Sequence, residues 1–136
     1  MDKLEYIPGD LVYIHGSLRI ISNCDGYYAT YYDENESLQE VNVIEGIPLT
    51  PEILEKNGWV KKVMSRGIKN SHWVYTKPDV EEYGYFPIYI EKGIGKEFDV
   101  YPFTYNNVCT QIAYIKYVHQ LQHLLFGLGL NSEMEV

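Results

Sequence analysis

Short runs of apolar residues separated by turn residues fill the first 45 positions, and this pattern predicts a series of short β-strands. The runs are DLVYIH (10–15), LRIIS (18–22), CDGYYATYY (24–32) and LQEVNVI (38–44). The turns between or within them are Gly16-Ser17, Asp25-Gly26 and the polar stretch DENES (33–37). An open sheet of such strands would expose its edges. We therefore expect residues 1–48 to close into a small SH3-like β-barrel.

The stretch IPLTPEILEKNGW (47–59) predicts a short connecting helix over 51–57. Thr50 is a good N-cap, and Pro51 at the first helical position sacrifices no hydrogen bond. Leu49 and Leu54 have the spacing of a hydrophobic staple, and Asn57-Gly58 ends the helix. All of these residues are explained by folding, so we expect a corner piece rather than a working site.

Residues 59–113 predict a second β-rich part. Its expected strands are WVKKVMS (59–65), HWVYTK (72–77) and the two halves of YFPIYIEKGIGKEFDVYPF around the turn at 92–96. VCTQIAY (108–114) fits either a further strand or the start of the last helix. Apolar residues then recur at helical spacing, which predicts an amphipathic helix over 114–128: Tyr114, Val118, Leu121, Leu125 and Leu128. The whole pattern predicts one compact α+β domain over 1–136 with antiparallel strands.

Composition narrows the functional classes. The net charge is −8, from 19 acids and 11 bases, which opposes binding to nucleic acid. No apolar run approaches the ~20 residues of a membrane helix, and the start lacks a signal-peptide pattern, so we expect a cytoplasmic protein with no membrane partner. Cys24 and Cys109 form no CxxC pair and are expected to be reduced thiols without a catalytic role.

Tyrosine usage is heavy, with fourteen tyrosines beside two tryptophans. Tyr27, Tyr28, Tyr31 and Tyr32 form two adjacent pairs on one predicted strand, so both faces of that strand would carry rings. One interpretation is a tyrosine-rich core whose hydroxyl groups reach the surface. The other is a recognition face, for which large, rigid, amphipathic rings are well suited.

Two histidines, His119 and His123, stand four residues apart on the last helix, a spacing that can bind one metal ion. The HExxH pattern and further nearby ligands are missing. We favour a structural interpretation, in which His119 and Gln122 hydrogen-bond to a neighbouring strand. We expect no cofactor, no resident metal and no catalytic residue.

The motifs GDLVYI, DGYYATYYDEN, IPLTPEILEKNGW and IKYVHQLQHLLFGL resemble a family of small, functionally uncharacterised bacteriophage and prophage proteins of gut Bacteroidetes. That family has an N-terminal β segment, an IPLTxExLxKxGF/W helix and a closing YVHxLQxLYFAL helix. The ending FGLGLNSEMEV departs from the family pattern. The resemblance implies a life in the bacterial host cytoplasm and carries no activity with it.

The leading functional hypothesis is a non-enzymatic binding protein, phage-associated, that acts on a host or phage protein partner. The alternative is a protein that binds or sequesters a small nucleotide-like ligand, with pockets between the subunits of a homo-oligomer. In that alternative, aromatic rings stack on a base and a cation meets a phosphate. Besides the four tyrosines, the candidate binding residues are Arg66, Lys69, Trp73 and Lys77.

Overall fold

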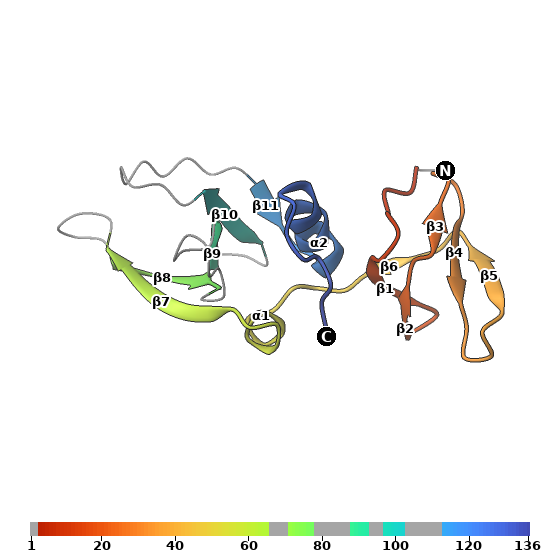
Figure 1. Ribbon diagram of the computed structural model, residues 1–136, viewed down its shortest axis with the longest axis horizontal. Coiled ribbons are helices and arrows are strands. Elements are labelled where there is room, and N and C mark those ends of the chain that lie inside the picture. Colours follow the sequence, from red (N-terminus) through yellow and green to blue (C-terminus); the bar gives the residue numbers. More distant parts are fainter. Residues whose placement is uncertain (1–2, 66–70, 78–87, 93–96, 103–112) are drawn as a thin grey trace. The chain divides into compact units, whose positions relative to one another are not determined.

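A computed structural model describes residues 3–65, 71–77, 88–92, 97–102 and 113–136 of the chain. Within these residues the fold is mixed α/β, with antiparallel sheets and two helices (Figure 1). The chain divides into two compact units: unit 1 spans 1–48 and 117–134, and unit 2 spans 49–116 and 135–136. Each unit is described by itself below, and the single compact domain stays a prediction.

Unit 1 contains two small antiparallel sheets. The first has the order β2-β1-β6, and the second has the order β3-β4-β5. Their bounds are β1 (Leu11–Ile14), β2 (Ser17–Ile20), β3 (Asn23–Cys24), β4 (Ala29–Tyr32), β5 (Leu38–Val41) and β6 (Glu45–Gly46). The core between them contains Val12, Ile14, Ile21, Ala29 and Val41, with Tyr6, Cys24, Tyr31 and Ile44 packed at its margin. The alternating apolar positions of the sequence therefore face one shared core.

The predicted barrel is not closed in the described residues. Each three-stranded sheet ends in edge strands, β2 and β6 in the first sheet and β3 and β5 in the second. The strands are only two to four residues long. Strands of this length give each sheet too few ladder hydrogen bonds to wrap round and pair its edges. The antiparallel α+β pattern is confirmed, and the closed barrel is wrong.

The first hairpin turns one residue earlier than the sequence predicted. Ile14 pairs with Ser17, so the turn residues are His15 and Gly16 rather than Gly16 and Ser17. Their φ angles are 49° and 79°. A two-residue turn with φ > 0 at both positions matches the right-handed twist of the flanking strands, and this requirement outweighs the cost of a left-handed histidine.

The C-terminal helix α2 (Val118–Gly127) also lies in unit 1 and begins four residues later than predicted. Tyr117 is still extended, because it forms an antiparallel β-bridge with Pro48. The backbone amide of the next residue, Val118, donates to the Ile47 carbonyl at 2.9 Å. Val118, Leu121 and Leu125 are buried as expected. Tyr114 is not on the helix stripe.

Unit 2 contains a five-stranded antiparallel sheet of order β11-β10-β9-β8-β7. Its strands are β7 (Val60–Ser65), β8 (Ser71–Thr76), β9 (Ile88–Lys92), β10 (Phe98–Pro102) and β11 (Ala113–Ile115). The two predicted hairpins are confirmed, because β7 pairs with β8 and β9 with β10. Residues 113–115 continue the sheet, so the last two residues of the open segment 108–114 are strand and not helix. Residues 108–112 lie outside the described residues.

The connecting helix α1 (Pro51–Lys56) belongs to unit 2 and has the predicted ends. The Thr50 hydroxyl accepts the Ile53 amide at 3.2 Å, and Asn57 caps the C-terminus before Gly58, whose φ is 85°. Asn57 also holds the end of the chain: its side-chain amide accepts from the Glu135 amide at 2.8 Å and donates to the Glu135 carbonyl at 2.7 Å. Neither α1 nor α2, the helices of the described segments, is long and apolar enough to cross a membrane.

Candidate functional site

A four-residue loop, 25–28, presents the first two candidate tyrosines. Cys24 pairs with Ala29, so the loop lies between β3 and β4. One carboxylate oxygen of Asp25 accepts the amides of Tyr27 at 2.9 Å and of Tyr28 at 2.8 Å. Both rings are exposed. The prediction that all four tyrosines lie on one strand is therefore wrong. The Asp25 side chain accepts the amides of Tyr27 and Tyr28, which would pair with the neighbouring strand if the turn had only two residues.

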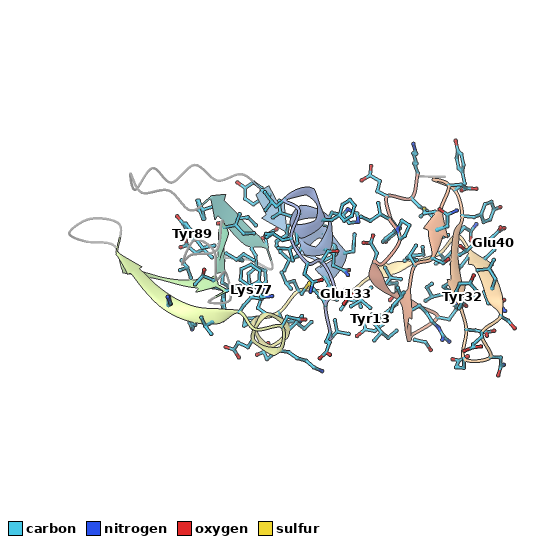
Figure 2. The ribbon with its side chains drawn as sticks, viewed as in Figure 1. Tyr13, Tyr32, Glu40, Lys77, Tyr89 and Glu133 are labelled. Atoms are coloured by element: carbon cyan, nitrogen blue, oxygen red, sulfur yellow. The ribbon has the colours of Figure 1, made fainter. Side chains whose placement is uncertain are left out.

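The second tyrosine pair lies on β4 and divides between its two faces. Tyr31 packs at the margin of the core, and the Arg19 guanidinium carbon lies 5.3 Å from its ring centroid. Tyr32 faces outward, is 59% exposed and stands opposite Leu38, which is 56% exposed. Figure 2 labels Tyr32 and Glu40 on the hairpin of β4 and β5. Both interpretations of the tyrosines hold in part: Tyr31 contributes to the core, and Tyr27, Tyr28 and Tyr32 are surface rings.

Acidic side chains build the turn between β4 and β5. One oxygen of Asp33 accepts the amides of Asn35 at 2.9 Å and Ser37 at 3.0 Å, and the other accepts the Gln39 side-chain amide at 3.0 Å. These hydrogen bonds, the Ser37 amide foremost, lower the pKa of Asp33. Backbone amides of Tyr28 and Tyr27 likewise lower the pKa of Asp25. Both carboxylates therefore stay ionised at neutral pH and hold their loops in one conformation.

Arg19 joins the two sheets of unit 1 at this turn. Its guanidinium group forms an ion pair with the Glu34 carboxylate, and this hydrogen bond lowers the pKa of Glu34. Lys3 and Arg19 are the two basic residues of unit 1, against ten acids, whereas unit 2 has nine acids and nine bases. All of the net charge of −8 therefore belongs to unit 1. The acidic unit is the one that carries the exposed tyrosine pair and Tyr32.

A second polar cluster lies where α2 meets the segment before β1. Asp10 is 1% exposed, and its carboxylate lies 2.6 Å from the His123 Nε2 atom and accepts the Ile7 amide at 2.9 Å. Burial raises the pKa of Asp10, and the hydrogen bonds from Ile7 and His123 oppose that rise. Gln122 beside it accepts the Leu11 amide at 2.9 Å and donates to the carbonyls of Gly9 and Ser132. This cluster fastens α2 to the first sheet.

His119 packs through its ring and does not form the predicted hydrogen bond. The ring lies between Tyr6 and Tyr117, with centroid distances of 4.9 and 5.6 Å. Its Nδ1 atom is buried without a hydrogen-bond partner in the described part of the chain. Burial, followed by the neighbouring His123, lowers the pKa of His119 to about 4. The expectation for Gln122 is confirmed, and that for His119 is wrong because aromatic neighbours fill its surroundings.

The two histidines do lie together, with ring centroids 5.7 Å apart. Nevertheless, the described residues contain no group of three or more His, Cys, Asp or Glu side chains arranged to hold a metal ion. The His123 ring is already hydrogen-bonded to Asp10. The Cys24 thiol lies 3.9 Å from the Leu4 carbonyl at the margin of the core.

The remaining candidates belong to unit 2. Arg66 and Lys69 lie outside the described residues, as does Cys109. Trp73 is a residue of β8, and the Lys77 ammonium lies 6.0 Å from the ring centroid of Trp59, which is buried. The predicted set is therefore divided between two units, with the four tyrosines in unit 1.

Sequence reasoning missed Asp10, Arg19 and Glu34 as structural partners and missed the burial of Gln122. One signal was present for Gln122: it stands four residues after Val118 and three before Leu125, within the apolar stripe of α2. The partners of Asp10 and Arg19 are distant in sequence, so no local pattern marks them.

No family model, curated protein or solved structure matches this chain. The resemblance to phage and prophage proteins therefore stays a prediction, and the function rests on the site itself.

Proposed function

We propose that this chain is a non-enzymatic binding protein whose acidic unit 1 binds a basic surface of a protein partner. The observation that carries the proposal is the charge distribution: ten acids and two bases in the unit that also exposes Tyr27, Tyr28, Tyr32 and Leu38. Exposed aromatic and aliphatic side chains supply the apolar centre of an interface. The surrounding carboxylates steer a basic partner toward it.

Preorganisation supports this proposal. Asp25 and Asp33 each accept at least two backbone amides, so the loop with Tyr27 and Tyr28 and the turn after Tyr32 are held in one conformation before any partner arrives. Ordering loops on binding costs free energy, and a surface that is ordered in advance avoids that cost.

The biological setting is part of the proposal and rests on the family resemblance alone. In that setting the chain is phage-associated, acts in the bacterial host cytoplasm and takes a host or phage protein as its partner. Neither nucleic acid nor a membrane suits an interface with this excess of carboxylates.

The test uses the full chain immobilised against a bacterial lysate, with quantitative mass spectrometry of the retained proteins. We expect retained proteins to be basic and to elute at ~0.5 M salt, where screening leaves a Debye length of about 4 Å. A Tyr27→Ser, Tyr28→Ser, Tyr32→Ser variant should lose them. Val60→Ser, which alters an exposed apolar residue of unit 2, is the matched control and should retain them. Equal retention by both variants would contradict the proposed site.

We also propose that β1 to β6 represent an open SH3-like arrangement. Support comes from the two three-stranded antiparallel sheets that share one core and from the direct contact of β2 with β4. An experimental structure of the full chain tests this proposal through the pairing of the edge strands.

The candidate groups of the nucleotide-binding alternative are divided between the units, with the exposed tyrosines in unit 1 and Lys77 in unit 2. Trp59, the ring beneath Lys77, is 2% exposed and cannot stack on a base without leaving the core. The alternative and the homo-oligomer that accompanies it stay predictions. A thermal-shift screen with nucleotides at millimolar concentration tests them, because a true ligand stabilises the fold by mass action.

A further inference from the structure

The strand β5 is an edge whose backbone groups can be assigned a direction. Its neighbour is β4, with Thr30 opposite Glu40 and Tyr32 opposite Leu38. The Thr30 carbonyl accepts the Ser22 amide at 2.7 Å, on the side of β4 away from β5. Thr30 and Glu40 are therefore a non-hydrogen-bonded pair. Because such pairs alternate along an antiparallel ladder, Tyr32 and Leu38 are a second one.

The amides and carbonyls of Leu38 and Glu40 consequently point away from β4. No backbone partner for them lies within the described residues. Two donors and two acceptors at a two-residue spacing form a ready template for an added strand. Figure 1 shows β5 as the outermost strand of its sheet.

The side chains along this edge determine which residues of an added strand would be complementary to it. Leu38 and Glu40 project from the same face of the sheet as Tyr32, since residues opposite each other or two apart share a face. An incoming residue beside Leu38 meets apolar surface from Leu38 and Tyr32. The residue two positions away meets the exposed Glu40 carboxylate. The complementary pattern is a basic residue and an apolar residue two positions apart.

We infer that the β5 edge takes an extended basic segment of the partner protein, which pairs its backbone with Leu38 and Glu40. The inference rests on the proposed function and names where and how the partner binds. A second copy of this chain is a poor occupant, because ten acids and two bases in unit 1 repel their like. Of the other three edges of unit 1, β3 and β6 are only two residues long. The edge β2 has Arg19 as its charged residue and exposes the apolar Leu18 and Ile20 on its other face, so it lacks the acid that a basic segment requires.

The experiment selects random twelve-residue peptides displayed on particles against the full immobilised chain at low salt. Affinities of the enriched peptides, made synthetically, are then measured for three proteins: the wild type, Glu40→Pro and Glu40→Gln. Proline removes the outward amide of residue 40 without touching the β4 ladder, which edge strands tolerate. Glutamine removes the same charge and keeps the amide, so it is the matched control. Melting temperatures confirm that both variants are folded.

We expect enriched peptides with basic and apolar residues two positions apart. Their affinity should fall at least about tenfold with Glu40→Pro, through a lost backbone hydrogen bond and an unpaired peptide carbonyl. With Glu40→Gln it should fall no more than about fivefold, the effect of one exposed charge pair. Enriched basic peptides that lose affinity equally with both variants would overturn strand addition at β5 and leave the proposed function standing. Failure to enrich any basic peptide would overturn strand addition at β5, and the lysate capture decides separately whether the proposed function stands.

Discussion

Gly46 is a position where a single added carbon has a calculable consequence. A Cβ there would lie 2.7 Å from the Tyr117 Cδ1 atom and 3.2 Å from the His119 Cε1 atom. We expect Gly46→Ala to destabilise the fold by about 1–3 kcal/mol, because the Tyr117 ring must move out of its packed position. Gly127→Ala is the control, since its Cβ would meet nothing within 4 Å. It should be neutral or stabilising by up to ~1 kcal/mol. Equal melting temperatures for the two variants would contradict the packing described around His119.

His119 predicts how stability depends on pH. Burial lowers the pKa of His119 from 6.5 to about 4 in the folded chain. The unfolded chain takes up a proton at the higher pH, so this residue's contribution is complete above about pH 6.5 and is lost as pH falls toward 4. Replacing His119 with Phe removes that titration and keeps a ring.

The melting temperature should therefore fall less in His119→Phe than in the wild type between pH 7 and pH 4.5, as measured by calorimetry at several pH values. The raised pKa of Asp10 acts in the opposite direction, because the folded chain then binds a proton more readily than the unfolded chain. Asp10 is present in both proteins, so the difference between them reports His119. Parallel curves would show that the ring is not desolvated.

At the scale of elements, α1 has its stability set by its cap. The Thr50 hydroxyl accepts the Ile53 amide at 3.2 Å. Thr50→Ala should cost about 1 kcal/mol in chemical denaturation, whereas Thr50→Ser keeps the acceptor and should cost little. Peptide binding at β5 should be unchanged in both variants. Loss of binding in a folded Thr50→Ala protein would assign α1 a functional role.

The helix α2 offers a matched pair of apolar residues. Leu121 is fully buried and Phe126 is 66% exposed. Leu121→Ala should leave a cavity and cost roughly 2–5 kcal/mol, a large share of the ~5–15 kcal/mol expected for a domain. Phe126→Ala should change the free energy of unfolding by about 0.5 kcal/mol or less. Similar costs from urea denaturation would mean that Phe126 is covered in solution.

At the scale of the whole molecule, the concentration of charge in unit 1 predicts a response to salt. With ten acids and only two bases, unit 1 carries excess carboxylates that repel one another, and added salt screens that repulsion. The melting temperature should rise between ~20 mM and ~500 mM sodium chloride, salt concentrations chosen to span short and long screening lengths. A triple variant with Glu5→Gln, Glu40→Gln and Glu45→Gln should have a higher melting temperature than the wild type at low salt. Its melting temperature should also rise less when salt is added. A salt-independent wild type would show that the carboxylates are too far apart to interact.

Local patterns in the sequence determined the elements whose causes lie within a few residues. Thr50, Pro51 and Asn57-Gly58 mark α1 with the ends it has, because caps and turn residues act on their immediate neighbours. The strand pairs of unit 2 follow alternation and turn residues in the same way. The excess of acids was also evident, since net charge is a property of composition.

Only the tertiary structure decided which segments that are distant in the sequence pack against each other. Tyr114 fits a helix stripe by spacing, yet it pairs with Asp99 in the sheet, and α2 begins only after Tyr117 has bridged to Pro48. Asp10 is hydrogen-bonded to His123, which is 113 positions away in the sequence. The acids were counted in the sequence, but the confinement of their excess over bases to unit 1 followed from the path of the chain. The spacing of apolar residues determines which face of an element is buried, but it does not determine which surface covers that face. That surface comes from contacts between segments that are distant in the sequence.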